Sequence, residues 1–256
     1  MIKKDGPQKR TLRVMSLNKV IPNILTLLAL ASGLTSMRFA LKEEWEHATL
    51  AIAVAAVLDA LDGRVARLLK GASKFGAELD SLSDFVCFGV APAMILYLWS
   101  MQNVGRWGWI ACMLFTMACG LRLARFNVAS EDTAKPAWAH AFFTGVPAPA
   151  GAGIVLLPLI LSFLGGDQYF RQPSLVVAWE LLAGGLLIST IPTFSFKTNR
   201  IPKSWMLPLM LFVAASATFI INKPWWSLTV LIVLYLISIP FSFRRQRILK
   251  NRKSAN

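Results

Sequence analysis

Long apolar stretches separated by short polar segments occupy most of this chain. A helix needs about 20 mostly apolar residues to cross the hydrocarbon core of a bilayer. Eight stretches approach that length, although charged residues interrupt two of them, 47–70 and 106–127. The pattern therefore predicts an all-α, polytopic integral-membrane helical bundle with about eight transmembrane helices. The expected spans are 20–41, 47–70, 81–100, 106–127, 146–165, 174–193, 205–222 and 225–243.

Residues 20–165 hold nearly all the polar groups inside these spans, and the helices after Ser174 contain few ionisable residues. This distribution indicates a six-helix functional core followed by a more hydrophobic C-terminal pair of helices. The connection at 128–145 is long and polar, as are many loops that cover binding sites. The expected units are a basic arm (1–19), the core (20–193), the C-terminal helix pair (194–243) and a basic tail (244–256).

Composition excludes an ordinary soluble domain, because hydrophobic residues make up 55% of the chain and the mean hydropathy is +0.55. The formal net charge is +14. Most of the 27 Lys and Arg residues lie before the first span, after the last span and in alternate connections. This asymmetry follows the positive-inside rule and predicts a multi-pass protein of the inner (cytoplasmic) membrane with both termini cytoplasmic. The basic tails are expected near anionic lipid headgroups, and no nucleic-acid partner is expected.

Four aspartates, Asp59, Asp62, Asp80 and Asp84, contrast with this apolar background. A charged side chain at membrane depth costs about 2.5–3.5 kcal/mol on insertion scales. Four charges of one sign are therefore expected only where something cationic lies among them. This segment is the candidate functional site.

Helical geometry predicts that the four carboxylates converge. Asp59 and Asp62 share one face of the second expected helix, and Asp80 and Asp84, four residues apart, share a face of the next. Residues 71–73 (Gly-Ala-Ser) supply a turn, so the two helices can fold back against each other.

Small residues accompany the first aspartate pair. Gly63 and Ala66 lie on the same face, with Arg67 at its edge, which leaves room for a bulky or phosphate-bearing ligand. Arg67 and Ser73 could complete a phosphate cradle.

A site of four carboxylates without His or Cys favours hard divalent cations such as Mg²⁺, Mn²⁺ or Ca²⁺. Two such ions would balance the four charges and suit metal-assisted phosphoryl transfer. The competing interpretation is a set of structural salt bridges with Arg64, Arg67 and Lys74. It is disfavoured because the aspartates outnumber these cations and lie on matched faces.

The spacing Asp59-x-x-Asp62-Gly63-x-x-Ala66-Arg67, eight residues, Gly76-x-x-x-Asp80-x-x-x-Asp84 resembles the CDP-alcohol phosphatidyltransferase signature at all eight positions. The resemblance implies that Asp59, Asp62, Asp80 and Asp84 bind two Mg²⁺ or Mn²⁺ ions. It also implies that Asp84 is the general base on the acceptor hydroxyl. The residues expected to bind the CDP-lipid are Asn23, Thr26, Gly63, Ala66, Arg67, Ser73 and Gly76, with Pro22-Asn23-x-x-Thr26 the looser match.

Two further segments, 122–127 (RLARFN) and 143–150 (FTGVPAPA), resemble bacterial membrane-embedded phosphatidylserine synthases of this family. The similarity extends over residues 22–164 and implies CDP-diacylglycerol and L-serine as substrates, with phosphatidylserine and CMP as products. Arg122 or Arg125 could bind the serine carboxylate bidentately, and Asn127 could orient the amino acid. Alternatively, both arginines extend to lipid phosphates at the helix end.

Other functions stay open at this point. The same chemistry could use another acceptor, such as glycerol 3-phosphate or an inositol derivative. A membrane aromatic prenyltransferase is disfavoured because its two Asp-rich motifs lie on distant helices, and a cation-coupled transporter is disfavoured because the chain shows no internal repeat. Dimers are common in the resembled family, which leaves a homodimer open.

Overall fold

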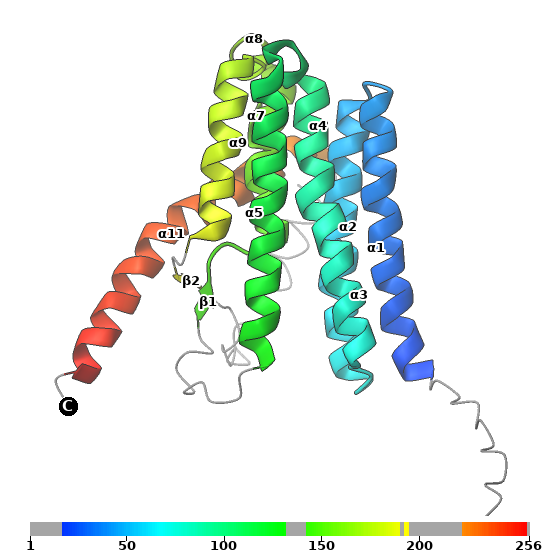
Figure 1. The fold of residues 1–256 in the computed structure, drawn as a ribbon, viewed down its shortest axis with the longest axis vertical. Helices are drawn as coiled ribbons and strands as arrows, with labels where there is room; N and C mark the ends of the chain where they lie inside the picture. Colours follow the sequence, from blue (N-terminus) through cyan, green and yellow to red (C-terminus); the bar gives the residue numbers. More distant parts are fainter. Residues whose placement is uncertain (1–16, 132–141, 190–191, 195–221, 255–256) are drawn as a thin grey trace, which may run out of the picture.

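The computed structural model describes residues 17–131, 142–189, 192–194 and 222–254, and Figure 1 shows them as a bundle of long helices. The N-terminal half contains α1 (Leu17–Leu41), α2 (Trp45–Leu68), α3 (Lys74–Asp84), η1 (Phe85–Val90), α4 (Ala91–Trp99), η2 (Met101–Val104) and α5 (Arg106–Glu131). The C-terminal half contains β1 (Phe142–Thr144), α6 (Ala148–Val155), α7 (Leu157–Leu161), η4 (Ser162–Gly166), α8 (Asp167–Phe170), α9 (Pro173–Ile188), β2 (Pro192–Phe194) and α11 (Pro224–Ser254).

Helices α1 and α2 pack along each other and are joined by a short turn (Figure 1). The Ser32 hydroxyl of α1 donates a hydrogen bond to the Ala51 carbonyl of α2 at 2.8 Å. Buried positions on α1 recur every three or four residues, at Thr26, Ala29 and Ala40 among others. This spacing gives α1 one packed face, as expected for a helix at the edge of a bundle.

The third expected span is a continuous helix from Lys74 to Trp99 with a π-helical segment, η1, in its middle. The segment starts immediately after Asp84 and docks on α1, where the Cys87 thiol donates to the Ala29 carbonyl at 3.3 Å. A Cβ on Gly33 would lie 2.5 Å from the Cys87 sulfur, so the two helices require glycine there. A π-helical turn shifts the helical register and frequently marks a functional site.

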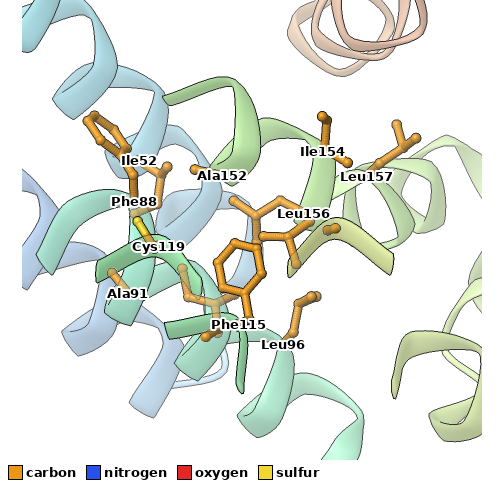
Figure 2. Close-up of a cluster of buried hydrophobic side chains, with 14 of the residues drawn as sticks. Ile52, Phe88, Ala91, Leu96, Phe115, Cys119, Ala152, Ile154, Leu156 and Leu157 are labelled. Carbon is orange, nitrogen blue, oxygen red and sulfur yellow. The ribbon is translucent and has the colours of Figure 1, made fainter. Parts of the chain in front are cut away.

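The hydrophobic core joins the two halves of the chain. Figure 2 shows it between α2, η1, α4, α5, α6 and the start of α7. The labelled side chains are Ile52, Phe88, Ala91, Leu96, Phe115, Cys119, Ala152, Ile154, Leu156 and Leu157. Because this core lies beside the segment that follows Asp84, packing fixes the orientation of the third span.

The fifth expected span, 146–165, is broken rather than straight. Helices Ala148–Val155 and Leu157–Phe170 meet at 48°. Pro158 lies in the first turn of α7, where it lacks the amide that a continuous helix would require. Before α6 and after α9, β1 and β2 form a short antiparallel ladder that pairs Phe143 with Thr193, an addition to the expected all-helical bundle.

Three described helices are long and apolar enough to cross a membrane, Val20–Leu41, Lys74–Trp99 and Arg106–Ala129, and the bent pair could form a fourth. Seven expected spans overlap described helices, although 146–165 is divided between α6, α7 and η4, and α9 ends at Ile188, before the end of 174–193. The remaining span, 205–222, lies outside the described residues except for its last residue. The count of eight, the cytoplasmic termini and the division into four units stay predictions. Most of the N-terminal arm and of the loop at 128–145 also lies outside the described residues, and α11 continues as helix through the expected basic tail to Ser254.

Candidate functional site

The turn between α2 and α3 brings the two aspartate pairs together. Helix α2 ends at Leu68, and the Gly71 amide donates to the Ala66 carbonyl at 2.9 Å. Lys70 adopts φ +50°, the left-handed conformation that often terminates a helix. Ser73 then caps α3, since its hydroxyl accepts a 3.0 Å hydrogen bond from the Gly76 amide. The turn predicted at 71–73 is thus confirmed. It reverses the direction of the chain, and these hydrogen bonds give partners to backbone groups at the end of α2 and the start of α3.

The carboxylates converge on a small volume. Asp59, Asp62 and Asp80 each offer an oxygen, and these oxygens lie within 4.8 Å of one another. Asp84 lies beside them, within hydrogen-bonding reach of the Asp59 carboxyl group. The two helix faces therefore meet as the spacing of the aspartates predicted, with Asp59 between the group of three and Asp84.

Asp62 is also held by α1. It is only 5% exposed, and its Oδ2 accepts a 2.7 Å hydrogen bond from the hydroxyl of Thr26, itself buried. A carboxylate oxygen has two lone pairs, so this bond fixes the carboxylate while leaving acceptor capacity for a ligand. Pro22, which begins the Pro22-Asn23-x-x-Thr26 segment, lies inside α1, because the helix already begins at Leu17.

The salt-bridge interpretation of the aspartates is wrong for the described part of the chain. The two ion pairs among the described residues, His47–Glu44 and Arg171–Asp167, involve none of the four aspartates. A group of carboxylates at membrane depth without a cation in contact is costly unless something positive binds there. The all-oxygen donor set and its close spacing therefore fit a hard divalent ion.

A cavity of about 290 Å³ opens beside the carboxylates, between α1, α2 and α3. Its lining includes every residue predicted to bind the CDP-lipid, together with two of the aspartates. The lining residues are Pro22, Asn23, Thr26, Asp62, Gly63, Ala66, Arg67, Gly71, Ala72, Ser73, Gly76, Ala77 and Asp80. Of these, Pro22, Gly71, Ala72 and Ala77 lay outside the predicted set, although Pro22 begins the looser match and the other three fall at unspecified positions within the signature.

The two signature glycines have different surroundings. A Cβ on Gly76 would lie 2.9 Å from Oδ1 of Asn23 and 3.2 Å from Oγ of Ser73, so a larger residue there would have to displace the Asn23 side chain. A Cβ on Gly63 would meet only the Arg67 Nη1, at 3.6 Å. Packing among the described residues does not account for Gly63, and the space above it belongs to the cavity.

The three residues predicted to bind the acceptor do not gather in one place. Arg122 of α5 interacts electrostatically with Asp84 and Asp59. Arg125 is exposed and donates through Nη1 to the Ile188 carbonyl at the end of α9, at 2.9 Å. Asn127 bonds to Ser81 on α3, its amide donating at 3.0 Å. Only Arg122 is thus brought to the carboxylates, while the other two contact neighbouring helices.

Comparisons with known proteins agree with this geometry. The family model CDP-alcohol phosphatidyltransferase matches residues 19–191, and the model CDP-alcohol phosphatidyltransferase 2 matches residues 204–240. A CDP-diacylglycerol–serine O-phosphatidyltransferase of Mycobacterium leprae (strain TN) is 40% identical over 238 residues, which cover 93% of this chain and 79% of the relative. The proteins of that name in Mycobacterium tuberculosis (strain ATCC 25618 / H37Rv) and Helicobacter pylori (strain ATCC 700392 / 26695) are 38% and 36% identical, over 90% and 85% of this chain and 80% and 88% of the relatives. The chain belongs to the CDP-alcohol phosphatidyltransferase family, whose members transfer a phosphatidyl group to an alcohol and depend on divalent metal.

Proposed function

We propose that this protein transfers the phosphatidyl group of CDP-diacylglycerol to the hydroxyl of L-serine, giving phosphatidylserine and CMP. The observation that carries the proposal is the junction of the aspartate cluster with the cavity between α1, α2 and α3. That junction places hard ligands beside a space of suitable size for part of a nucleotide. The choice of serine is supported by the names of the relatives, which cover most of the chain.

The cavity residues bind the CDP part of the lipid in this proposal. Arg67 lies at the cavity edge as a permanent cation for the pyrophosphate. Gly63 leaves its helix surface open, so a flat or bulky group can approach the backbone. Asn23 and Thr26 add polar groups from α1, with Thr26 also orienting Asp62. Ala66, Ser73 and Gly76 complete the wall.

Asp59, Asp62, Asp80 and Asp84 would hold two divalent ions, Mg²⁺ or Mn²⁺. When bound, such ions would neutralise the negative charge of the pyrophosphate and the charge that develops on the departing CMP. The protein contributes the fixed positions of the carboxylates, which the α2–α3 turn and the Thr26 hydrogen bond determine.

Asp84 accepts the proton of the serine hydroxyl as the serine oxygen attacks the phosphatidyl phosphorus. A new phosphorus–oxygen bond forms to serine, the phosphorus–oxygen bond to CMP breaks, and CMP leaves with that electron pair. Arg122, near Asp84, binds the serine carboxylate on the acceptor side of the aspartates. The site then faces the cytoplasm of a multi-pass inner-membrane protein with cytoplasmic termini, where a soluble amino acid can reach it.

The test measures CMP release from CDP-diacylglycerol by the purified protein in lipid nanodiscs with Mg²⁺ or Mn²⁺. The acceptors are L-serine, glycerol 3-phosphate and inositol 1-phosphate, each supplied alone. We expect CMP and phosphatidylserine to form in equal amounts with serine and no CMP above background with the others. Release with glycerol 3-phosphate but not with serine would assign a different acceptor to the same chemistry.

The two signature glycines offer a matched pair of variants. In Gly63→Ala the new methyl clashes with nothing, and alanine is favoured in a helix by about 1 kcal/mol, so the melting temperature should hold or rise. The methyl occupies the cavity, however, and we expect the KM for CDP-diacylglycerol to rise at least tenfold, roughly the effect of losing one good contact.

In Gly76→Ala the methyl meets Asn23 and Ser73, so we expect a lower melting temperature as well as weaker binding. Thermal unfolding in detergent and initial-rate kinetics separate the two cases. An unchanged KM in a stable Gly63→Ala protein would show that the ligand does not occupy that space.

A further inference from the structure

Ser83 is a buried polar residue of α3 that the signature leaves unspecified and that does not line the cavity. It is only 3% exposed, and its hydroxyl donates a hydrogen bond to the Thr26 carbonyl of α1, at 3.3 Å. A buried hydroxyl is costly unless it is hydrogen-bonded, and here the bond reaches a neighbouring helix. Ser83 also directly precedes Asp84 and follows Asp80 by three residues.

The bond of Ser83 differs from the usual bond of a helical serine. Such a serine commonly donates to the carbonyl four residues earlier in its own helix, as Ser81 does to Ala77 at 3.1 Å. Ser83 donates to α1 instead, and Cys87, one turn further, donates to the Ala29 carbonyl of α1 at 3.3 Å. The Cys87 sulfur, 3.8 Å from the Ser83 hydroxyl, is a weaker acceptor than a carbonyl. These bonds fix the position of α1 along α3 and η1.

Thr26 is held through both its backbone and its side chain. Its carbonyl accepts from Ser83, and its hydroxyl donates to Oδ2 of Asp62 on α2, at 2.7 Å. The same hydroxyl lies 3.1 Å from the Pro22 carbonyl of its own helix. A threonine hydroxyl carries a single hydrogen, so Asp62 and Pro22 compete for it. A small displacement of Thr26 away from Asp62 would therefore favour the Pro22 carbonyl and release the carboxylate.

These hydrogen bonds connect the three helices that surround the cavity, α1, α2 and α3 (Figure 1). Helices α2 and α3 carry the two aspartate pairs, and their covalent connection is the segment 69–73. The route from Ser83 through Thr26 to Asp62 is a second connection, and it lies at the level of the aspartates. A metal site depends on the groups that hold its ligands in place, so this connection bears on ion binding.

We propose that Ser83 is a positioning residue of the carboxylate site, which acts through Thr26 to fix Asp62 relative to Asp80 and Asp84. This inference rests on the metal site of the proposed function, in which these aspartates are ligands. Ser83 contacts neither the ion nor the lipid. It holds the backbone of Thr26 where the Thr26 hydroxyl stays on the carboxylate.

The alternative is that Ser83 only stabilises the packing of α1 on α3. Ser32 offers a matched comparison, because its hydroxyl makes the same kind of bond between helices, to the Ala51 carbonyl of α2 at 2.8 Å. Among the described residues, Ser32 belongs neither to the cavity lining nor to the carboxylate cluster. Ser83→Ala and Ser32→Ala should lower the melting temperature by similar amounts, while only Ser83→Ala should weaken ion binding.

The test measures Mn²⁺ binding to protein stripped with a chelator, without substrate, in a double-mutant cycle of Ser83→Ala and Thr26→Val. Valine keeps the shape of threonine but lacks the hydroxyl that holds Asp62. We expect Mn²⁺ affinity to fall about fivefold in Ser83→Ala, the equivalent of one net hydrogen bond, and about 10–100-fold in Thr26→Val. Because Ser83 acts through the Thr26 hydroxyl, adding Ser83→Ala to Thr26→Val should lower the affinity no further.

Unchanged Mn²⁺ affinity in Ser83→Ala would overturn the inference. An equal loss of affinity in the Thr26→Val background, or in Ser32→Ala, would also overturn it, because the effect would then not pass through Thr26. If the alanine variant does not fold, Ser83→Cys keeps a weaker donor, and its smaller fall in affinity should likewise disappear in Thr26→Val; the same outcomes count against the inference. Failure of the unmodified protein to bind Mn²⁺ would instead reject the metal site of the proposed function.

Discussion

Replacing Asp84 with asparagine is expected to lower kcat by about 10³-fold or more, within the usual 10²–10⁴-fold contribution of a positioned general base. The substitution keeps the size of the side chain but removes its ability to take the serine proton. Because Asp84 lies beside Asp59 and outside the group of three carboxylates, the KM for CDP-diacylglycerol should change far less than kcat. Initial rates of CMP release over a range of lipid concentrations measure both constants.

Asp167→Asn is a suitable control for Asp84→Asn. Asp167 is an exposed residue of α8 whose carboxylate contacts only Arg171, at 3.9 Å, among the ion pairs of the described residues. Its replacement should leave kcat unchanged. A parallel loss of Mn²⁺ binding in Asp84→Asn, large enough to explain the whole fall in kcat, would show that Asp84 acts only as a metal ligand and would contradict its additional assignment as the base.

Asp59→Asn is expected to produce the second large effect, through metal binding. Asp59 is the carboxylate shared between the group of three and Asp84, so its loss removes a ligand and disturbs both aspartate pairs. We expect divalent-ion affinity to fall by at least about 100-fold, since even outer-shell partners of a metal cost 10–100-fold. Activity at ordinary Mg²⁺ should then be lost and should return in part as Mg²⁺ or Mn²⁺ is raised.

Binding of Mn²⁺ to protein stripped with a chelator gives the affinity directly, independently of turnover. Glu78→Gln provides the control, because Glu78 is an exposed carboxylate on the same helix as Asp80 and belongs to no carboxylate cluster of the described residues. It should bind Mn²⁺ as the unmodified protein does. Undiminished Mn²⁺ affinity in Asp59→Asn would refute the assignment of Asp59 as a ligand.

The carboxylate site could be predicted because it depends on local periodicity. Asp59 and Asp62 belong to one helix and Asp80 and Asp84 to the next, and a connection of only five residues, 69–73, leaves little choice in how the helices meet. Gly63, Ala66, Arg67 and Ser73 of the cavity lining followed from the same local spacing, whereas Asn23, Thr26 and Gly76 were implied only by the family resemblance. Which residues share one face of a helix follows from backbone geometry alone, so it does not depend on how the rest of the chain packs.

The acceptor side could not be predicted in the same way. Arg122, Arg125 and Asn127 lie within six residues of one another on α5, yet they contact the aspartates, α9 and α3 respectively. Adjacent helical residues point in different directions, and what each one meets depends on which helix packs on that side.

The sequence by itself determined a helical membrane protein and the place where its charges converge, because hydrophobic stretches of spanning length and the aspartate spacing act through local rules. Only the tertiary structure decided the π-helical turn after Asp84, the bend at Pro158, the β1–β2 ladder and the approach of Arg122 to Asp84. These features arise from contacts between distant segments. Their energies depend on shape and on which polar groups find partners, and no local pattern in the chain encodes either.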